Sequence, residues 1–167
     1  MGDSIIATTL NSVLGRTAHV AVALAGASIV GMAGVEAWQV FARYVLNNSP
    51  SWTEPVALLL MSTAMMLGAA AGVRANRHFG FFLLVEHASP GVRRVLLFIP
   101  KLIALAVGSM LAGWGVEMMI DAWDFQMAGA PLPQGVVFLP MCVGGALIAL
   151  FALEQLISPP PPIVSGE

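Results

Sequence analysis

Charged residues are scarce in this sequence. Lys, Arg, Asp and Glu together make up 10% of its 167 residues, whereas hydrophobic residues make up 58%. Soluble domains typically contain about 25% charged residues, so this composition excludes a soluble globular fold. The formal net charge is -2, and the chain therefore lacks the basic surface that nucleic-acid binding requires. We expect an integral membrane protein without a separate soluble domain.

Cysteine and histidine are scarce as well. Cys142 is the only cysteine, which excludes intramolecular disulfides, paired-thiol redox chemistry and thiolate metal clusters. The three histidines, His19, His78 and His87, lie at or beyond the ends of apolar runs, where they cannot face one another to hold haem. The sequence also lacks a phosphate-binding loop and the motifs of metalloproteases and hydrolases. It predicts no catalytic residue, cofactor, metal or enzymatic activity.

Long apolar runs, in contrast, fill most of the chain. Four of them are long enough to cross a bilayer core, which takes about 20 helical residues. Small residues recur in each run at four-residue spacing, which lets a neighbouring helix approach closely. The expected fold is an all-α integral membrane protein, a single domain over residues 1–167. Its four transmembrane helices are expected at about 19–43, 55–74, 95–120 and 135–157, and their small residues are Ala23, Ala27 and Gly31; Ala64, Gly68 and Gly72; Ala104, Gly108 and Ala112; and Gly145 and Ala149.

Basic residues gather between the second and third runs. Five of the seven Lys and Arg lie there, whereas the connection over 121–134 carries two acids and no base. By the positive-inside rule the basic loop faces the cytoplasm, so both termini lie inside and the connection after the first run lies outside. The basic side chains can meet anionic lipid headgroups or an acidic loop of a partner. They are Arg74, Arg77, Arg93, Arg94 and Lys101.

Two segments beside the spans are predicted to be helical or interfacial. The apolar stretch within about 78–94 is too short to cross a membrane and predicts an interfacial arm on the cytoplasmic side. Ser89 and Pro90 are typical of a helix start, and this helix should run to about Ile120 with a kink at Pro100. Residues 1–17 have helical spacing of apolar residues, which is compatible with a helix along the membrane surface and with a frayed terminus.

The polar turn between the first two runs is the most distinctive stretch. Asn47, Asn48 and Pro50 interrupt the apolar pattern, because Asn favours turns and Pro disfavours a helical predecessor. Thr53 is then expected to cap the second helix. Aromatic residues prefer the headgroup layer. The aromatic residues at the two mouths of the turn are Tyr44 and Trp52.

This turn resembles a motif of a known transporter family. An Arg-Tyr-(x)2-Asn turn followed by Trp-(Ser/Thr)-Glu at the start of a second span is similar to the small, DctQ-type membrane subunit of the tripartite ATP-independent periplasmic (TRAP) transporters. The exit of the second span resembles the family too. One departure is that Pro55 takes the place of the family's usual second acid. The matching residues are Arg43, Tyr44, Asn47, Trp52 and Glu54 in the turn and Gly68, Arg74, Arg77 and His78 at the exit.

The resemblance implies a function and two protein partners. A small permease subunit of this type would be a static scaffold in the bacterial inner membrane. It would bind a large membrane subunit that carries the transport sites, and would help to dock a periplasmic solute-binding protein. The transporter would take up organic acids by ion-coupled secondary active transport. Membrane lipids would be its other neighbours.

Two other functions remain compatible with the residues themselves. Glu36, Gln39 and Arg43 share one helical stripe, and charged residues at membrane depth need a partner or a function. We expect Arg43 to pair with Glu54 or Glu36. The alternative is that Glu36 and Glu117 belong to an ion path, which would fit a self-sufficient homodimeric transporter. The chain could equally be the membrane anchor of an unrelated complex.

Overall fold

The structure is a computed structural model that describes residues 2–75 and 89–157, where its regular elements are helices. The helix α1 is unusually long, at 43 residues. Four helical stretches are long and apolar enough to cross a membrane, which confirms the expected four-helix membrane fold. The elements are α1 (Gly2–Tyr44), α2 (Thr53–Arg74), α4 (Pro90–Asp121), the short 3-10 helix η1 (Gln134–Phe138) and α5 (Leu139–Ile157).

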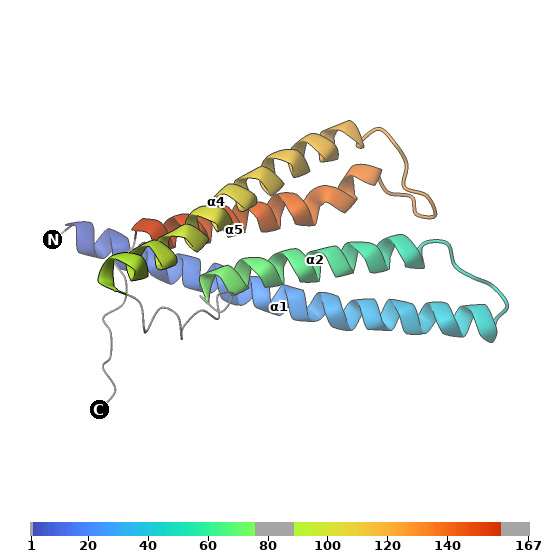
Figure 1. Ribbon diagram of the computed structural model, residues 1–167. Coiled ribbons are helices and arrows are strands. Elements are labelled where there is room, and N and C mark those ends of the chain that lie inside the picture. Colours follow the sequence, from blue (N-terminus) through green and yellow to red (C-terminus); the bar gives the residue numbers. More distant parts are fainter. Residues whose placement is uncertain (1, 76–88, 158–167) are drawn as a thin grey trace, which may run out of the picture.

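The four long helices lie side by side in a row, in the order α1, α2, α5, α4 (Figure 1). Each helix packs against the next, so that α1 and α4 form the two edges. A row of this kind leaves much of its surface uncovered. Only 6% to 33% of the most apolar window of each helix is buried within the described chain. The fold is therefore an open layer of helices and not a closed bundle.

Two hydrophobic clusters of buried residues lie toward one end of the row. Leu14 of α1, Ala70 of α2 and Ile148 and Phe151 of α5 form one core cluster. A second cluster joins Ala21, Ala25 and Leu67 with Leu147 packed against it. We call this end of the row the Arg74 end, and the opposite end the Trp52 end. The pairs α1/α2 and α5/α4 spread apart toward the Trp52 end (Figure 1).

Two contacts set the register of the antiparallel helices α1 and α2. A Cβ built on Gly31 would lie 3.5 Å from Leu60, and one on Gly15 would lie 3.4 Å from Arg74. Counting along both helices from these contacts places Glu36 and Glu54 at about the same level. The last two turns of α1 therefore extend beyond the start of α2, as Figure 1 shows.

The helix boundaries confirm some expectations and correct others. Ser89 and Pro90 begin α4 as predicted, with Pro90 as its first residue. Residues 2–17 are not a separate surface element, because α1 is continuous from Gly2 and buries Leu14 against α2 and α5. Thr53 does not cap α2. It is the first helical residue, fully buried, and its hydroxyl donates a 2.9 Å hydrogen bond to the Pro50 carbonyl.

The predicted small-residue contacts are correct for α4 and α5 and partly wrong for α1 and α2, because Gly31 of α1 does contact Leu60. A Cβ on Gly108 would lie 2.6 Å from the Ala149 nitrogen, and one on Gly145 would lie 2.6 Å from the Ala112 nitrogen. In α1, however, Ala23 and Ala27 are exposed, and the buried small residues are Ala21, Ala25 and Ser28. In α2, Gly68 is exposed. Four-residue spacing of small residues occurs on two faces of α1, and the spacing alone does not say which face packs.

The predicted interfacial arm at about 78–94 falls mostly outside the described residues. Residues 76–88 are not described, and residues 90–94 already belong to α4. Arg77 and His78 also lie outside the described part of the chain, so their predicted roles stay predictions.

Candidate functional site

The turn that carries the family-like motif forms the tip of the Trp52 end. Tyr44 is the last residue of α1 and is 76% exposed. The chain reverses because the backbone N–H of Asn48 donates a 3.1 Å hydrogen bond to the Ala42 carbonyl, and because Asn47 takes a positive φ of 49°. Asn tolerates this left-handed conformation better than most residues, which explains its place in the turn.

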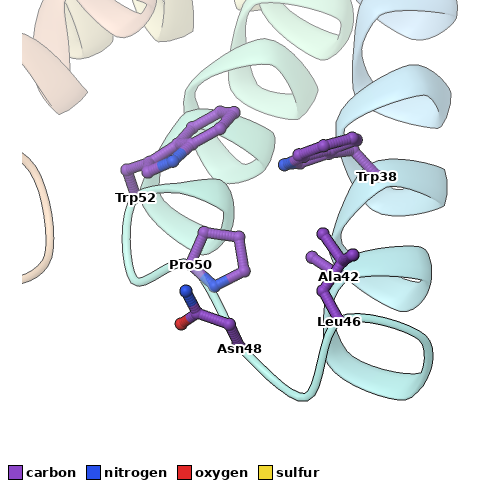
Figure 2. A pocket seen from close by; sticks show the side chains of 6 residues that line it. All are labelled: Trp38, Ala42, Leu46, Asn48, Pro50 and Trp52. Atoms are coloured by element: carbon purple, nitrogen blue, oxygen red, sulfur yellow. The ribbon is translucent and has the colours of Figure 1, made fainter.

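A cleft opens between the end of α1 and the start of α2 (Figure 2). Its volume is 340 Å³. Trp38 and Trp52 form opposite walls, and Trp38 also lies against Phe41, with 5.9 Å between ring centroids. None of the six described side chains that line it is titratable, and the cleft is suited to apolar contacts. The lining residues are Trp38, Ala42, Leu46, Asn48, Pro50 and Trp52.

Two loops meet at the Trp52 end, the turn between α1 and α2 (residues 45–52) and the loop between α4 and η1 (residues 122–133). The Ser51 hydroxyl donates a 3.1 Å hydrogen bond to the Gly129 carbonyl. Gly129 has a φ of +87°, and a Cβ there would collide with the carbonyl oxygen of Ser51. Within the loop, Met127 and Leu132 are joined by a 2.8 Å backbone hydrogen bond, and Met127 is buried. The two loops therefore form one connected surface.

Charged side chains at the Trp52 end are exposed and lack ion-pair partners within the described residues. The expected pairing of Arg43 with Glu54 or Glu36 is absent: no N–O distance within 4.0 Å joins them. The register explains the absence. Arg43 lies seven residues beyond Glu36 on α1, about 10 Å along the axis, while Glu54 is level with Glu36. The exposed charges are Glu36, Arg43, Glu54, Glu117, Asp121 and Asp124.

The Arg74 end carries a polar network that links three helices. Arg74 forms an ion pair with Glu154 of α5, with Nε–Oε2 and Nη2–Oε1 distances of 3.1 Å. The same guanidinium donates to the side-chain oxygen of Asn11 in α1 at 2.9 Å and to its carbonyl at 3.2 Å. Its Cζ lies 5.7 Å from the ring centroid of the buried Phe151, in cation–π range. Fork-shaped binding of this kind fixes orientation as well as distance.

Gln155 extends this network to α4. Its side-chain nitrogen donates to the carbonyls of Val73 and Arg74 at 2.6 and 3.3 Å, which satisfies acceptors that the end of α2 leaves open. The backbone carbonyl of Gln155 accepts a 2.9 Å hydrogen bond from the Lys101 ammonium group. All four long helices are thus joined at this end by side-chain hydrogen bonds.

The sequence identified Arg74 as a site residue but missed its partners. The missed residues are Asn11, Glu154 and Gln155, and Lys101, which the sequence placed among the basic residues, binds Gln155. One signal was present, since Glu154 is the only charged residue within 135–157 and lies at the same membrane side as Arg74. A lone acid near a lone base at the same depth indicates an ion pair.

The side-chain contacts described at the two ends of the row join helices and loops to one another. No group of three or more potential metal-binding side chains occurs in residues 2–75 and 89–157. Within the same residues, every buried side-chain nitrogen and oxygen atom has a hydrogen-bond partner. The described site thus holds helices in place at one end and presents exposed residues at the other.

Comparison with known proteins gives two matches. The family model described as "Tripartite ATP-independent periplasmic transporters, DctQ component" matches residues 32–159. A protein of Haemophilus influenzae named "Putative TRAP transporter small permease protein" is 26% identical over 117 residues, which cover 70% of this chain and 72% of that protein. Both the turn at the Trp52 end and the ion pair at the Arg74 end lie within residues 32–159.

Proposed function

The chain belongs to the DctQ family, the small permease components of TRAP transporters, and we propose that it serves its transporter as a static scaffold. It is a membrane protein of a family of transporter components and not an enzyme. In the proposed role it binds the large transport subunit within the membrane. It also helps to dock a periplasmic solute-binding protein, while the large subunit carries out ion-coupled uptake of organic acids.

The open row of helices is the observation that carries this proposal. A chain that transported a solute alone would need a polar path between its helices. Here Glu36, Glu54 and Glu117 are exposed and have no ion-pair partner within the described residues, and Glu36 lies level with the first turn of α2. The uncovered parts of the row instead offer a large apolar surface for another membrane protein.

The charge distribution supports an orientation in the bacterial inner membrane. Arg16, Arg74 and Lys101 lie toward the Arg74 end, which is therefore proposed to face the cytoplasm. Both ends of the chain then lie inside. Asp121 and Asp124 lie at the Trp52 end, which is proposed to face the periplasm. The two connected loops there offer a surface on which a soluble partner could rest.

Purification of the native complex tests this function. A tagged copy is extracted from its native membrane in mild detergent, and bound proteins are identified by mass spectrometry. The expected result is one large multispan membrane subunit in stoichiometric amount. The purified chain alone in proteoliposomes should not transport organic acids. A homodimer with uptake activity of its own, or a bound redox protein, would contradict the scaffold function in favour of the other two readings of the sequence.

A further inference from the structure

All exposed residues within α2 lie on one narrow stripe. They are spaced by four, three, four and three residues, which places them on a single face of the helix. The rest of α2 is buried or half-buried, because α1 and α5 pack against its two sides. The stripe consists of Glu54, Leu58, Met61, Met65 and Gly68.

Gly68 is the informative residue of this stripe. A glycine inside a helix costs about 1 kcal/mol relative to alanine. Gly108 and Gly145 offset that cost, because neighbouring backbone occupies the space where their Cβ atoms would lie. Gly68 has no such neighbour among the described residues, none of which lies within 4 Å of its Cβ position. Within the chain, Gly68 leaves only a notch in the exposed face.

A notch of this kind favours a protein neighbour over lipid. Lipid tails adapt to any apolar side chain, so they give no advantage to glycine, whereas small residues let a second helix approach closely. Met61 and Met65 beside the notch are flexible and adapt to a partner's shape. Glu54 ends the stripe as an exposed carboxylate without an ion-pair partner in the described chain.

We propose that the α2 stripe, from Glu54 to Gly68, is the binding surface for one transmembrane helix of the large transport subunit. That helix places a bulky apolar side chain against Gly68 and a Lys or Arg side chain near Glu54. The inference rests on the proposed scaffold function and specifies its contact surface.

Other open glycines do not make an equally defined surface. Within residues 2–75 and 89–157, Gly26 and Gly34 of α1 and Gly113 of α4 also have nothing within 4 Å of their Cβ positions. These helices form the edges of the row, however, and their exposed residues spread around much of the helix circumference. The helix α2 lies inside the row and exposes only this one stripe.

Substitution of two open glycines gives a matched test. Gly68→Leu and Gly113→Leu add the same side chain to an exposed helix position, and only the first lies on the stripe. Each variant is purified from cells that contain the complete transporter, and the large subunit that remains bound is quantified. Gly68→Leu should lower the bound fraction about tenfold or more, the effect expected from overpacking a close interface. Gly113→Leu should retain it, and both isolated chains should keep the wild-type elution volume.

The outcomes separate this inference from the function beneath it. If the wild-type chain retains no large subunit, the scaffold function is wrong. If wild type and Gly68→Leu retain it equally, or if only Gly113→Leu loses it, the function stands and the stripe is wrong.

Cysteine crosslinking gives a second readout if Gly68→Leu fails to fold. With Cys142→Ala as background, Met65→Cys should form a disulfide with a cysteine scanned along one helix of the large subunit. Met110→Cys on the exposed face of α4 is the control. Crosslinking of Met65→Cys to a second copy of this chain, or to no position of the large subunit, would overturn the proposal.

Discussion

The two ends of the helix row differ in whether their charged side chains are paired within the chain. At the Arg74 end, charged and amide side chains bind one another across helices, and Arg74 and Glu154 keep only 20% and 16% of their side-chain surface exposed. At the Trp52 end, Arg43 and the acids point outward without ion-pair partners in the described chain. The Arg74 end therefore holds its charges within the chain, whereas the charges at the Trp52 end are accessible to other molecules.

The two ends also differ in the contacts that join the helices. Side chains of Arg74, Gln155 and Lys101 join the helices at one end. At the other end the helix pairs spread apart, and the pairs meet where α2 contacts η1 and where Ser51 binds the backbone of Gly129. A structure held at one end by side chains and at the other by a backbone contact should respond differently to substitution at each end.

The largest effect is expected from Glu154→Ala. The substitution leaves the half-buried Arg74 guanidinium without its carboxylate. We expect the free energy of unfolding to fall by about 2 kcal/mol, less than for a fully buried pair, because both side chains keep some contact with solvent. The thermal unfolding midpoint of the purified chain in detergent measures this change.

Glu117→Ala is the matched control for that experiment. Glu117 is also an acid in an apolar helix, but it is exposed and has no ion-pair partner in the described residues. Its removal should leave the unfolding midpoint unchanged. Equal midpoints for Glu154→Ala and wild type would mean that the ion pair does not stabilise the chain.

The second effect concerns the backbone contact at the Trp52 end. Gly129→Ala places a Cβ against the Ser51 carbonyl and forces alanine into a left-handed conformation, which alone costs about 1–2 kcal/mol. Amide hydrogens over residues 126–133 should exchange faster with solvent, while those at the Arg74 end keep their wild-type rates. Hydrogen exchange with mass spectrometry measures both regions at once.

Ser51→Ala separates the two contributions to this contact. It removes the hydroxyl that donates to Gly129 but keeps the glycine backbone. Its effect on exchange should be smaller than that of Gly129→Ala. If Gly129→Ala also accelerates exchange around Arg74, the two ends are coupled and the contrast between them does not hold.

The sequence was sufficient for features that depend on local composition. The length of the apolar runs predicted four spans, and Ser89 with Pro90 predicted the start of α4, because helix starts have a local chemistry. The small residues Gly108 and Gly145 were also identified correctly. These features need no knowledge of which helix lies beside which.

The sequence was insufficient where the result depends on helix order and register. The partners of Arg74 lie 63 and 80 positions away in the chain, and only the packing of α1 and α5 beside α2 brings them together. The exposed position of Gly68 likewise depends on which side of α2 its neighbours cover. Register also explains why Arg43 forms no ion pair with Glu54 within the described chain, because Glu54 is level with Glu36, about two helical turns from Arg43.

The smallest effect, for the same reason, is expected from Arg43→Ala. Arg43 is exposed, about two turns beyond the level of Glu36 and Glu54, and forms no ion pair in the described chain. Substitutions at such surface positions usually change stability by less than about 0.5 kcal/mol, so the unfolding midpoint of the isolated chain should match wild type. Any role of Arg43 must then show in the complex, as a weaker association with a partner at the Trp52 end. A clear loss of stability in the isolated chain would show instead that Arg43 binds an acid of its own chain, and that this end, too, is held together from within.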